Sequence, residues 1–305
     1  MPRVVIIGDR GSGKTTFLGL LYAAQVKSGT DTADDFRFHV TYESLDEITE
    51  VFQQLMSGSF PDAASKEGIR EIRFHLSYGR AGRFLSRLRS RGSSPGEAAS
   101  FRFVLLRNLE DDLSPFRRGT SGTNGKLRDV LESDAIAILV DSTRLAVNDE
   151  DREAGSMGKY DTAVEALLST IQRSRSRDAR SVVYPIFIFS KFDSVRPEAL
   201  RAADVESEPP GISKPGPRSA YARALLDHNL PKTMAKIGVH EARGLKFATP
   251  SYCFSWVRTE GAAQGRPPKV RLRRSGAIGW EPDYAKDEYI ALLDSLRTIA
   301  THAGH

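Results

Sequence analysis

The chain has 305 residues, 40% of them hydrophobic and 27% charged, which is the composition of an ordinary globular protein. It is long enough to bury a full core, and no apolar run approaches the roughly 20 residues that a membrane-spanning helix needs. The sequence starts directly in an apolar strand, so we expect neither a signal peptide nor a transmembrane segment. The single cysteine, Cys253, excludes an internal disulfide framework, is expected to be a buried structural thiol, and favours a cytoplasmic location.

The formal net charge is +5, the pI is about 9.3, and the positive charge is clustered. Each cluster would suit a contact with nucleic acid, an acidic membrane or an acidic protein. The simpler interpretation, which we favour, is a solvated arginine-rich surface. The three clusters are Arg80, Arg83, Arg87, Arg89 and Arg91; Arg173, Arg175, Arg177 and Arg180; and Arg266, Lys269, Arg271, Arg273 and Arg274.

The first 25 residues combine an apolar strand, a glycine-rich turn and an amphipathic helix. The strand covers residues 4–7, and the turn from Gly8 to Thr15 reads G-x-x-x-x-G-K-T. Backbone N–H groups converge at the start of the following helix, where the helix dipole also favours an anion. We therefore predict a phosphate-binding loop in which Lys14 contacts the β- and γ-phosphates and Thr15 ligates Mg²⁺. The loop residues are Asp9, Arg10, Gly11, Ser12, Gly13, Lys14, Thr15 and Thr16.

Alternating strand and helix patterns follow along the rest of the chain. Strands alternating with helices predict right-handed crossovers and a mostly parallel sheet with helices on both faces, an α/β fold. Predicted strands cover residues 36–42, 69–78, 101–106, 135–141, 182–189 and 247–256. Predicted helices cover residues 43–56, 162–171, 219–237 and 284–301. Predicted loops or excursions cover residues 58–67, 79–99, 107–125, 148–159, 197–217 and 258–279.

A second diagnostic stretch, Ser190-Lys191-Phe192-Asp193, comes directly after the apolar strand 182–189. An aspartate at the carboxyl end of a strand can accept two hydrogen bonds from the N1–H and the N2 amino group of guanine. Adenine offers neither group in that geometry, so an unpaired buried carboxylate would reject it. The alternative is an ordinary surface loop, because Lys and Asp are common after strands.

The phosphate loop and this S-K-x-D stretch together resemble the small Ras-like GTPases, whose corresponding element is [N/T]-K-x-D. The resemblance covers most of the chain in element order and is nearest to prokaryotic members of that superfamily. It implies one three-layer P-loop domain over residues 1–305, with insertions near 30–56, 79–99, 107–125, 194–217 and 258–279. It also implies GTP or GDP and Mg²⁺ as ligands, and an effector or regulatory protein as partner.

The resemblance also implies a guanine site, which would be lined by Ser190, Lys191, Asp193 and Ser255. Ser255 would belong to the family's last motif, S-A-x, although it is equally compatible with a plain strand residue. We expect the adjacent Trp256 to lie in the core rather than to stack on the base.

The family's D-x-x-G motif is missing after the strand 101–106. Asn108 lies nearest the expected aspartate, and a carboxylate of the cluster 110–112 would reach a metal only from a displaced position. Ser65 is our first candidate for the switch residue that contacts Mg²⁺ and the γ-phosphate, ahead of Thr30 and Thr32. No glutamine follows the strand to orient water, and nothing distinguishes Arg107, Arg117 or Arg118 as a catalytic arginine.

Three functions therefore remain open from the sequence. The first is a Mg²⁺-dependent switch with slow GTP hydrolysis, since positioning and charge stabilisation carry most of phosphoryl transfer. The second is a nucleotide-binding scaffold without turnover, which the missing D-x-x-G favours. The third is an ATP-using P-loop enzyme, for which Asp141, at the end of the strand 135–141, would be the Walker B acid.

Overall fold

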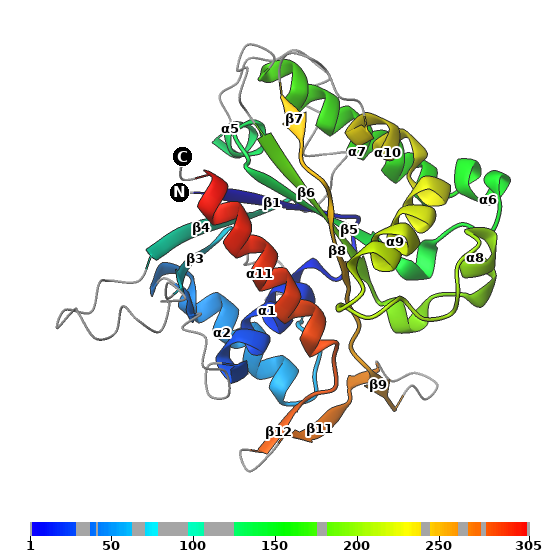
Figure 1. Cartoon of the computed structure of the whole chain (residues 1–305). Coiled ribbons are helices and arrows are strands. Elements are labelled where there is room, and N and C mark those ends of the chain that lie inside the picture. The colour runs from blue at the N-terminus through cyan, green and yellow to red at the C-terminus, as the bar shows by residue number, and fades with distance from the viewer. Residues whose placement is uncertain are drawn as a thin grey trace.

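The computed structural model describes residues 2–28, 37–40, 42–62, 71–78, 97–106, 125–175, 182–238, 245–261, 268–275 and 279–303 (Figure 1). An eight-stranded sheet forms the middle of three layers, in the order β2-β3-β4-β1-β5-β6, with β7 and β8 both pairing with β6. Its strands are β1 (Arg3–Ile7), β2 (Arg37–Val40), β3 (Glu71–Tyr78), β4 (Glu97–Leu105), β5 (Ala135–Asp141), β6 (Val182–Ser190), β7 (Lys246–Phe247) and β8 (Ser251–Phe254).

The sheet is parallel from β4 through β1, β5 and β6 to β7 and β8, and antiparallel only where β2 and β3 extend the β4 edge. β1 lies at the centre because residues 4–7 are apolar and fully buried. Val5 and Ile7 pack into one core and Val4 and Ile6 into the other, as the period-2 alternation of a strand requires.

Helices cover both faces of the sheet, which confirms the predicted α/β architecture. The face of Val4 and Ile6 is covered by α1 (Lys14–Ser28), α2 (Tyr42–Met56) and α11 (Lys286–Ala303). The face of Val5 and Ile7 is covered by α5 (Gly125–Leu131), α7 (Ser156–Ser174), α9 (Pro215–Asn229) and α10 (Pro231–Gly238). Shorter elements are η1 (Ser142–Arg144), α6 (Asp149–Ala154), η2 (Phe192–Ser194) and α8 (Pro197–Ala202).

The predicted helix 219–237 is two helices, α9 and α10, which meet at Leu230 and Pro231. Proline lacks an N–H and clashes with the preceding turn, so a new helix begins at this residue. Asp161 of α7 caps that helix: its carboxylate accepts the backbone N–H groups of Lys232 at 3.0 Å and Thr233 at 2.9 Å. The break is therefore built into the packing of α7 against α10.

Other boundaries also differ from the sequence prediction. The predicted strand 247–256 is interrupted between β7 and β8, and the predicted excursions contain α6, α8 and the first residues of β4 and α9. The predicted loop 258–279 contains short antiparallel ribbons, whose strands are β9 (Thr259–Glu260), β10 (Lys269–Val270), β11 (Leu272–Ser275) and β12 (Gly279–Pro282). These strands are too short and too rich in arginine to show an apolar alternation, which is why the sequence predicts a loop there.

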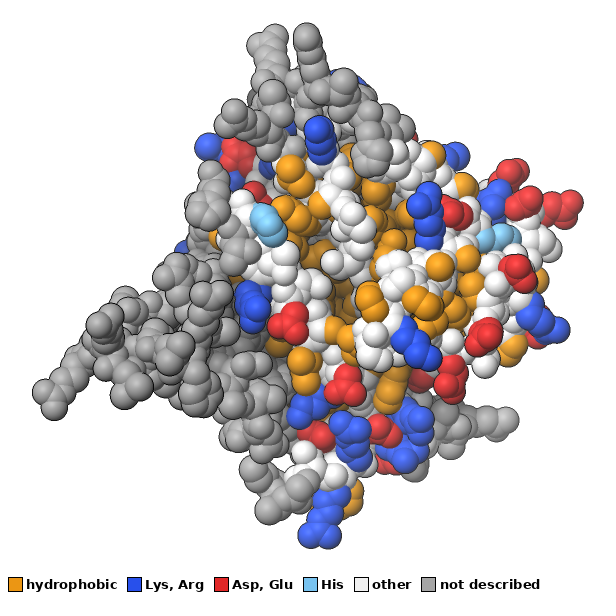
Figure 2. Space-filling model, viewed as in Figure 1, with side chains coloured by type: hydrophobic (Ala, Val, Ile, Leu, Met, Phe, Trp, Pro, Cys, Tyr) orange, Lys and Arg blue, Asp and Glu red, His pale blue; other side chains and the backbone are white. Residues whose placement is uncertain are grey.

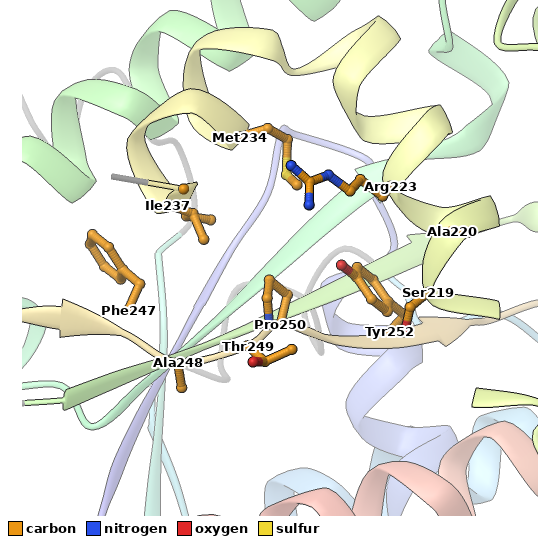
Figure 3. A pocket seen from close by; sticks show the side chains of 11 residues that line it. Ser219, Ala220, Arg223, Met234, Ile237, Phe247, Ala248, Thr249, Pro250 and Tyr252 are labelled. Carbon is orange, nitrogen blue, oxygen red and sulfur yellow. The ribbon is translucent and has the colours of Figure 1, made fainter. Parts of the chain in front are cut away.

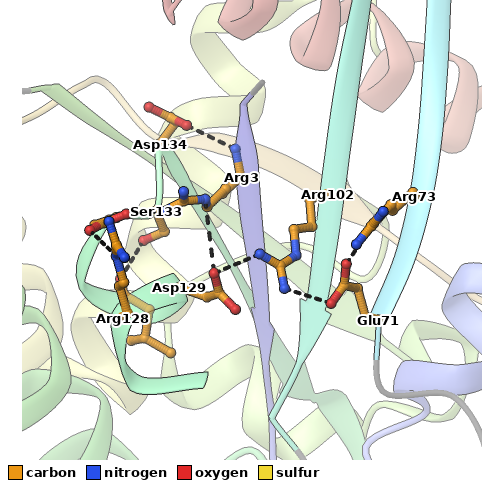
Figure 4. A network of polar contacts seen from close by, with 10 residues as sticks. Arg3, Glu71, Arg73, Arg102, Arg128, Asp129, Ser133 and Asp134 are labelled. Atoms are coloured by element: carbon orange, nitrogen blue, oxygen red, sulfur yellow. Dashed lines mark hydrogen bonds and ion pairs between the residues drawn. The ribbon is translucent and has the colours of Figure 1, made fainter. Parts of the chain in front are cut away.

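A charged network joins β1, β3, β4 and α5 (Figure 4). Arg102 is its centre: its Nη1 donates to Asp129 Oδ1 at 2.8 Å and its Nη2 to Glu71 Oε2 at 2.7 Å. Arg73 Nε also donates to Glu71, at 2.9 Å. Burial tends to raise the pKa of Glu71, but the hydrogen bonds and charges of Arg102 and Arg73 outweigh it, so the net pKa shift is downward.

The depressed pKa of Glu71 makes its contribution to stability depend on pH. The contribution is present above the carboxyl's unfolded pKa of about 4.3 and is lost as pH falls through the lower folded pKa. We expect Glu71→Gln to reduce the free energy of unfolding by about 1 kcal/mol at pH 7, and by less as pH approaches 4, in urea titrations. Glu150→Gln, on the exposed face of α6, is the control. A Glu71→Gln deficit that stays constant with pH would contradict this account.

Candidate functional site

The predicted phosphate loop is a tight turn between β1 and α1. Gly11 and Gly13 have φ values of +79° and +88°, which other residues rarely adopt. The Lys14 side chain folds back over the loop, and its Nζ donates to the carbonyl oxygens of Gly8 and Asp9, the latter at 2.8 Å. The first turn of α1 contains no acidic residue, so the positive end of the helix dipole and the Lys14 ammonium lie together.

The same turn is closely packed beneath the loop. A Cβ atom on Gly8 would lie 2.6 Å from Ser12 Oγ and 3.0 Å from Leu139 Cβ, so only glycine fits there. Ser12 N donates to the Asp9 carbonyl at 3.1 Å, which closes the turn. Ser12 is buried and no hydrogen-bond partner of its hydroxyl is present in the described structure. The loop is thus a compact, electropositive backbone cradle.

The S-K-x-D stretch follows β6, two strands away from β1. Lys191 adopts a left-handed conformation with φ of 53°, and the short helix η2 then carries Asp193. The Asp193 side chain is exposed, yet desolvation of its carboxyl group raises its pKa, against a hydrogen bond from its own backbone N–H and the nearby charge of Arg258. Because η2 directly follows β6, Asp193 lies at the carboxyl end of the parallel strands. This is the position where the sequence predicts an aspartate that binds the base.

Ser255, at the end of β8, joins the same edge through its backbone. Its N–H donates to the Phe189 carbonyl at 2.8 Å, and its carbonyl accepts the Phe192 N–H at 3.0 Å. Its hydroxyl instead meets the Tyr289 hydroxyl at 2.6 Å in the core. The side chain of Ser255 thus holds α11, and only its backbone lies beside the S-K-x-D stretch.

Trp256, expected in the core, is half-buried. The guanidinium of Arg258 lies 5.5 Å from the centre of its ring, a cation–π distance. Cys253, in contrast, is buried as predicted, and burial raises the pKa of its thiol well above the usual value. The thiol is consequently unsuited to act as a nucleophile.

Asp141 lies buried at the end of β5, between the two predicted binding segments. Its Oδ2 accepts Lys191 Nζ at 2.7 Å, and its Oδ1 accepts the backbone N–H and the hydroxyl of Thr143 at 3.2 and 2.7 Å. Arg144 follows on η1, with its Nε 3.7 Å from Asp141 Oδ2. Arg144 also donates to Asp9 Oδ2 at 3.0 Å and to the Arg10 carbonyl at 3.2 Å.

The contacts of Thr143 and Arg144 are not predicted from the sequence. The available signal was the D-S-T-R stretch from Asp141 to Arg144 at the end of an apolar strand, since carboxyl ends of parallel strands meet at one edge. The sequence predicts a role for Asp141 only as a Walker B acid. The carboxylate is instead engaged by a lysine, a hydroxyl and a backbone N–H.

Several predicted residues lie outside the described residues. They are Thr30, Thr32, Ser65, Arg107, Asn108, Glu110, Asp111, Asp112, Arg117 and Arg118. Among the residues that are described, no group of three or more His, Cys, Asp or Glu side chains is arranged to hold a metal ion. Thr15, the predicted Mg²⁺ ligand, lies at the start of α1.

A separate cavity of about 440 Å³ lies between α9, α10 and the connection from β7 to β8 (Figure 3). Met234, Ile237 and Phe247 form much of its wall, and Arg223 and Tyr252 add polar groups. None of the predicted site residues lines it. The cavity is therefore distinct from the phosphate loop and from the S-K-x-D stretch.

Basic side chains are interspersed with acidic ones on the visible face, including the end where β11 and β12 lie (Figure 2). Arg271 lies 3.4 Å from Asp283, and Arg273 Nε donates to Glu281 at 3.1 Å, so part of the third arginine cluster is paired. The first cluster lies outside the described residues. Within the described ranges, no helix has the length and apolar character needed to cross a membrane.

Comparisons with known proteins add little to these observations. No protein-family model matches the chain, and no curated protein matches it. Among solved structures, it is similar to a signal recognition particle receptor SRb-GTP/SRX complex from Chaetomium thermophilum, with 16% sequence identity and a TM-score of 0.36. That match covers 83% of this chain and 90% of the other. Function is therefore inferred from the residues of this chain.

Proposed function

We propose that the protein is a Ras-like guanine-nucleotide-binding switch that takes GTP and GDP with Mg²⁺. The observation that carries the proposal is the convergence of two segments far apart in sequence. Asp141 connects to Lys191 of the S-K-x-D stretch at 2.7 Å, and its neighbour Arg144 connects to Asp9 of the phosphate loop at 3.0 Å. A phosphate cradle and a base-reading aspartate at one edge of a parallel sheet suit a nucleotide that spans both.

The phosphate half of the site would act through backbone and charge. The N–H groups at the start of α1 and the Lys14 ammonium would bind the β- and γ-phosphates. The Thr15 hydroxyl would help to hold Mg²⁺, which would supply positive charge to offset the negative charge of the phosphates. Gly11 and Gly13 supply the positive φ values that let the backbone wrap an anion.

The base half would act through Asp193 and Lys191. An ionised Asp193 would accept the N1–H and N2 amino hydrogens of guanine, and the Lys191 stem would lie along the nucleotide. Ser190 and Ser255 would support the segment, Ser255 through the backbone hydrogen bonds that join β8 to β6.

Hydrolysis would be slow without help from a partner. The sequence carries no D-x-x-G and no glutamine in the segment directly after β4, so the groups that usually hold the magnesium-bound water and orient the attacking water are missing. Ser65 remains the proposed switch residue, contributing to the metal site and to catalysis. An effector or regulatory protein is the proposed partner, in a cytoplasmic setting.

The base preference tests this proposal. We expect the wild-type protein with Mg²⁺ to bind fluorescent GDP and GTP analogues more tightly than ATP analogues, and Asp193→Asn to lose at least about tenfold of that preference. Because only the ionised carboxylate accepts both hydrogens and its pKa is raised, wild-type GDP affinity should fall as pH is lowered toward that pKa, at a higher pH than an ordinary aspartate would require. Asp204→Asn, in the turn after α8, is the control. ATP binding that is indifferent to Asp193→Asn would refute the guanine assignment.

One alternative is favoured by a specific observation. The missing D-x-x-G supports a nucleotide-binding scaffold without turnover. Single-turnover GTP hydrolysis, with and without candidate partners, separates the two functions: a rate equal to that of GTP in buffer would favour the scaffold. The ATP-using enzyme loses support, because Lys191 and Thr143 already occupy the carboxylate of its only proposed Walker B acid, Asp141.

A further inference from the structure

The side chain of Arg144 bridges two segments that the chain separates by more than 100 residues. Its Nη1 donates to Asp9 Oδ2 at 3.0 Å and its Nη2 to the Arg10 carbonyl at 3.2 Å, so both contacts reach the phosphate loop. Its Nε lies 3.7 Å from Asp141 Oδ2. A planar guanidinium makes such divergent contacts from one rigid group, which a lysine cannot reproduce.

Asp141 is the fixed point of this bridge. Its side chain is 3% exposed, and Thr143 holds Oδ1 through two hydrogen bonds. Its Oδ2 accepts Lys191 Nζ at 2.7 Å. A buried carboxylate held by this many donors has little freedom to move, so contacts on either side of it are placed relative to each other.

Among the described side chains, Asp141 and Arg144 connect the S-K-x-D stretch to the phosphate loop. Ser190, the first residue of the S-K-x-D stretch, donates to the Val140 carbonyl at 3.3 Å and so is directed to β5. The connection instead runs from Lys191 through Asp141 and Arg144 to Asp9 and Arg10. The Lys191–Asp141 and Arg144–Asp9 links are charge-assisted hydrogen bonds, the stronger class, and the link from Arg144 Nε to Asp141 Oδ2 is a longer ion pair at 3.7 Å.

We propose that Arg144 is a positioning residue that fixes the position of the phosphate loop relative to the S-K-x-D stretch, and thereby slows nucleotide release. The inference rests on the proposed function, because it concerns the same site. A loop that is already held in its binding conformation loses less entropy when the nucleotide binds. The gain appears chiefly as a slower dissociation rate, as it does for most affinity differences within one site.

The test is the dissociation rate of a fluorescent GDP analogue, chased with excess GDP in the presence of Mg²⁺. Arg144→Ala should release GDP about tenfold faster than the wild type, and Arg144→Lys should recover only part of the difference. The preference for GDP over ADP should stay unchanged, because Asp193 and the Lys191–Asp141 pair remain. A general loss of structure would instead lower the melting temperature and blunt that preference.

Arg196→Ala is the matched control. Arg196 donates to the carbonyl of Leu145, next to Arg144 in sequence, at 2.7 Å, and has a comparably exposed side chain, but its described contacts do not reach the phosphate loop. Equal GDP release from the Arg144→Ala and Arg196→Ala variants would overturn the proposal. A double-mutant cycle gives a second criterion. The double variant Asp9→Ala/Arg144→Ala should raise the GDP dissociation rate by less than the product of the two single fold-changes. A fold-change equal to that product would also overturn the proposal.

The outcomes separate this inference from the function on which it rests. If the wild type binds adenine nucleotides in preference to guanine, the proposed function fails, but ADP release from the Arg144→Ala variant still tests the bridge. If the wild type binds guanine nucleotides and Arg144→Ala releases them at the wild-type rate, only the bridge fails. If the wild type binds no nucleotide, both fail.

Discussion

Lys14→Ala is expected to weaken GTP and GDP binding by about 100-fold or more. The ammonium would contribute charge-assisted hydrogen bonds to two phosphates, each worth about 1.5–3 kcal/mol, and every 1.4 kcal/mol is a factor of ten in affinity. The same Nζ donates to the Gly8 and Asp9 carbonyls, so the substitution also removes a contact that shapes the loop. Both effects act in the same direction.

Titration of fluorescent GDP and GTP analogues measures the Lys14→Ala effect directly. Lys214→Ala, which removes an exposed lysine just before α9, should leave affinity at the wild-type value. The melting temperature of each variant distinguishes loss of a phosphate contact from loss of the fold. Affinity unchanged by Lys14→Ala would mean that the loop does not bind phosphate, whatever its sequence.

A second large effect is expected at the buried ion pair between Arg218 of α9 and Glu288 of α11. The two side chains are 9% and 14% exposed, and Arg218 also donates to the Pro210 carbonyl at 3.0 Å. Its guanidinium lies 4.7 Å from the centre of the Phe254 ring, and Glu288 Oε2 accepts the Phe254 N–H at 2.9 Å. The pair therefore fixes two helices to the end of β8.

Arg218→Met is expected to reduce the free energy of unfolding by about 3–5 kcal/mol, because it leaves the Glu288 carboxylate buried without its cation. Burial already raises the pKa of Glu288, against the Phe254 N–H and Arg218, so the charged form is costly there. Adding Glu288→Gln to Arg218→Met should recover part of the loss. Urea denaturation followed by circular dichroism measures each value.

The exposed pair Arg201–Glu198, at 3.0 Å on α8, provides the control for Arg218. Its side chains are 73% and 55% exposed, so Arg201→Met should cost less than about 1 kcal/mol. If Arg218→Met cost no more than Arg201→Met, the buried pair would have no special part in stability.

Where the hydrophobic pattern is strong, the sequence predicts the fold well. The apolar run 135–141 corresponds residue for residue to β5, and the glycine-rich turn lies between β1 and α1 as predicted. These segments are buried on both faces or carry a glycine requirement, so local sequence alone determines them. The three-layer α/β arrangement follows from their alternation.

The prediction fails where tertiary contacts decide. Pro231 divides 219–237 locally, but the Asp161 cap that secures the new helix comes from α7, and the ribbon of β11 and β12 carries the cross-strand pair Arg273–Glu281. For the site, the sequence predicts which residues stand at the carboxyl ends of β1, β5, β6 and β8. It does not predict that Arg144 reaches across to Asp9, because the reach of a side chain is set by the distance between strands that are not consecutive in the chain.

The contacts of α11 have a consequence for the order in which the site is completed during synthesis. Phe17 of α1 lies 5.4 Å, ring centre to ring centre, from Tyr289 of α11, and Tyr289 also meets Ser255. The glycine-rich turn 8–13 is made long before residues 286–303, which form the helix that packs against α1. The emerging chain therefore carries an intact glycine-rich sequence before α1 has this packing partner, and the candidate site is packed as in the folded protein only once α11 has been made.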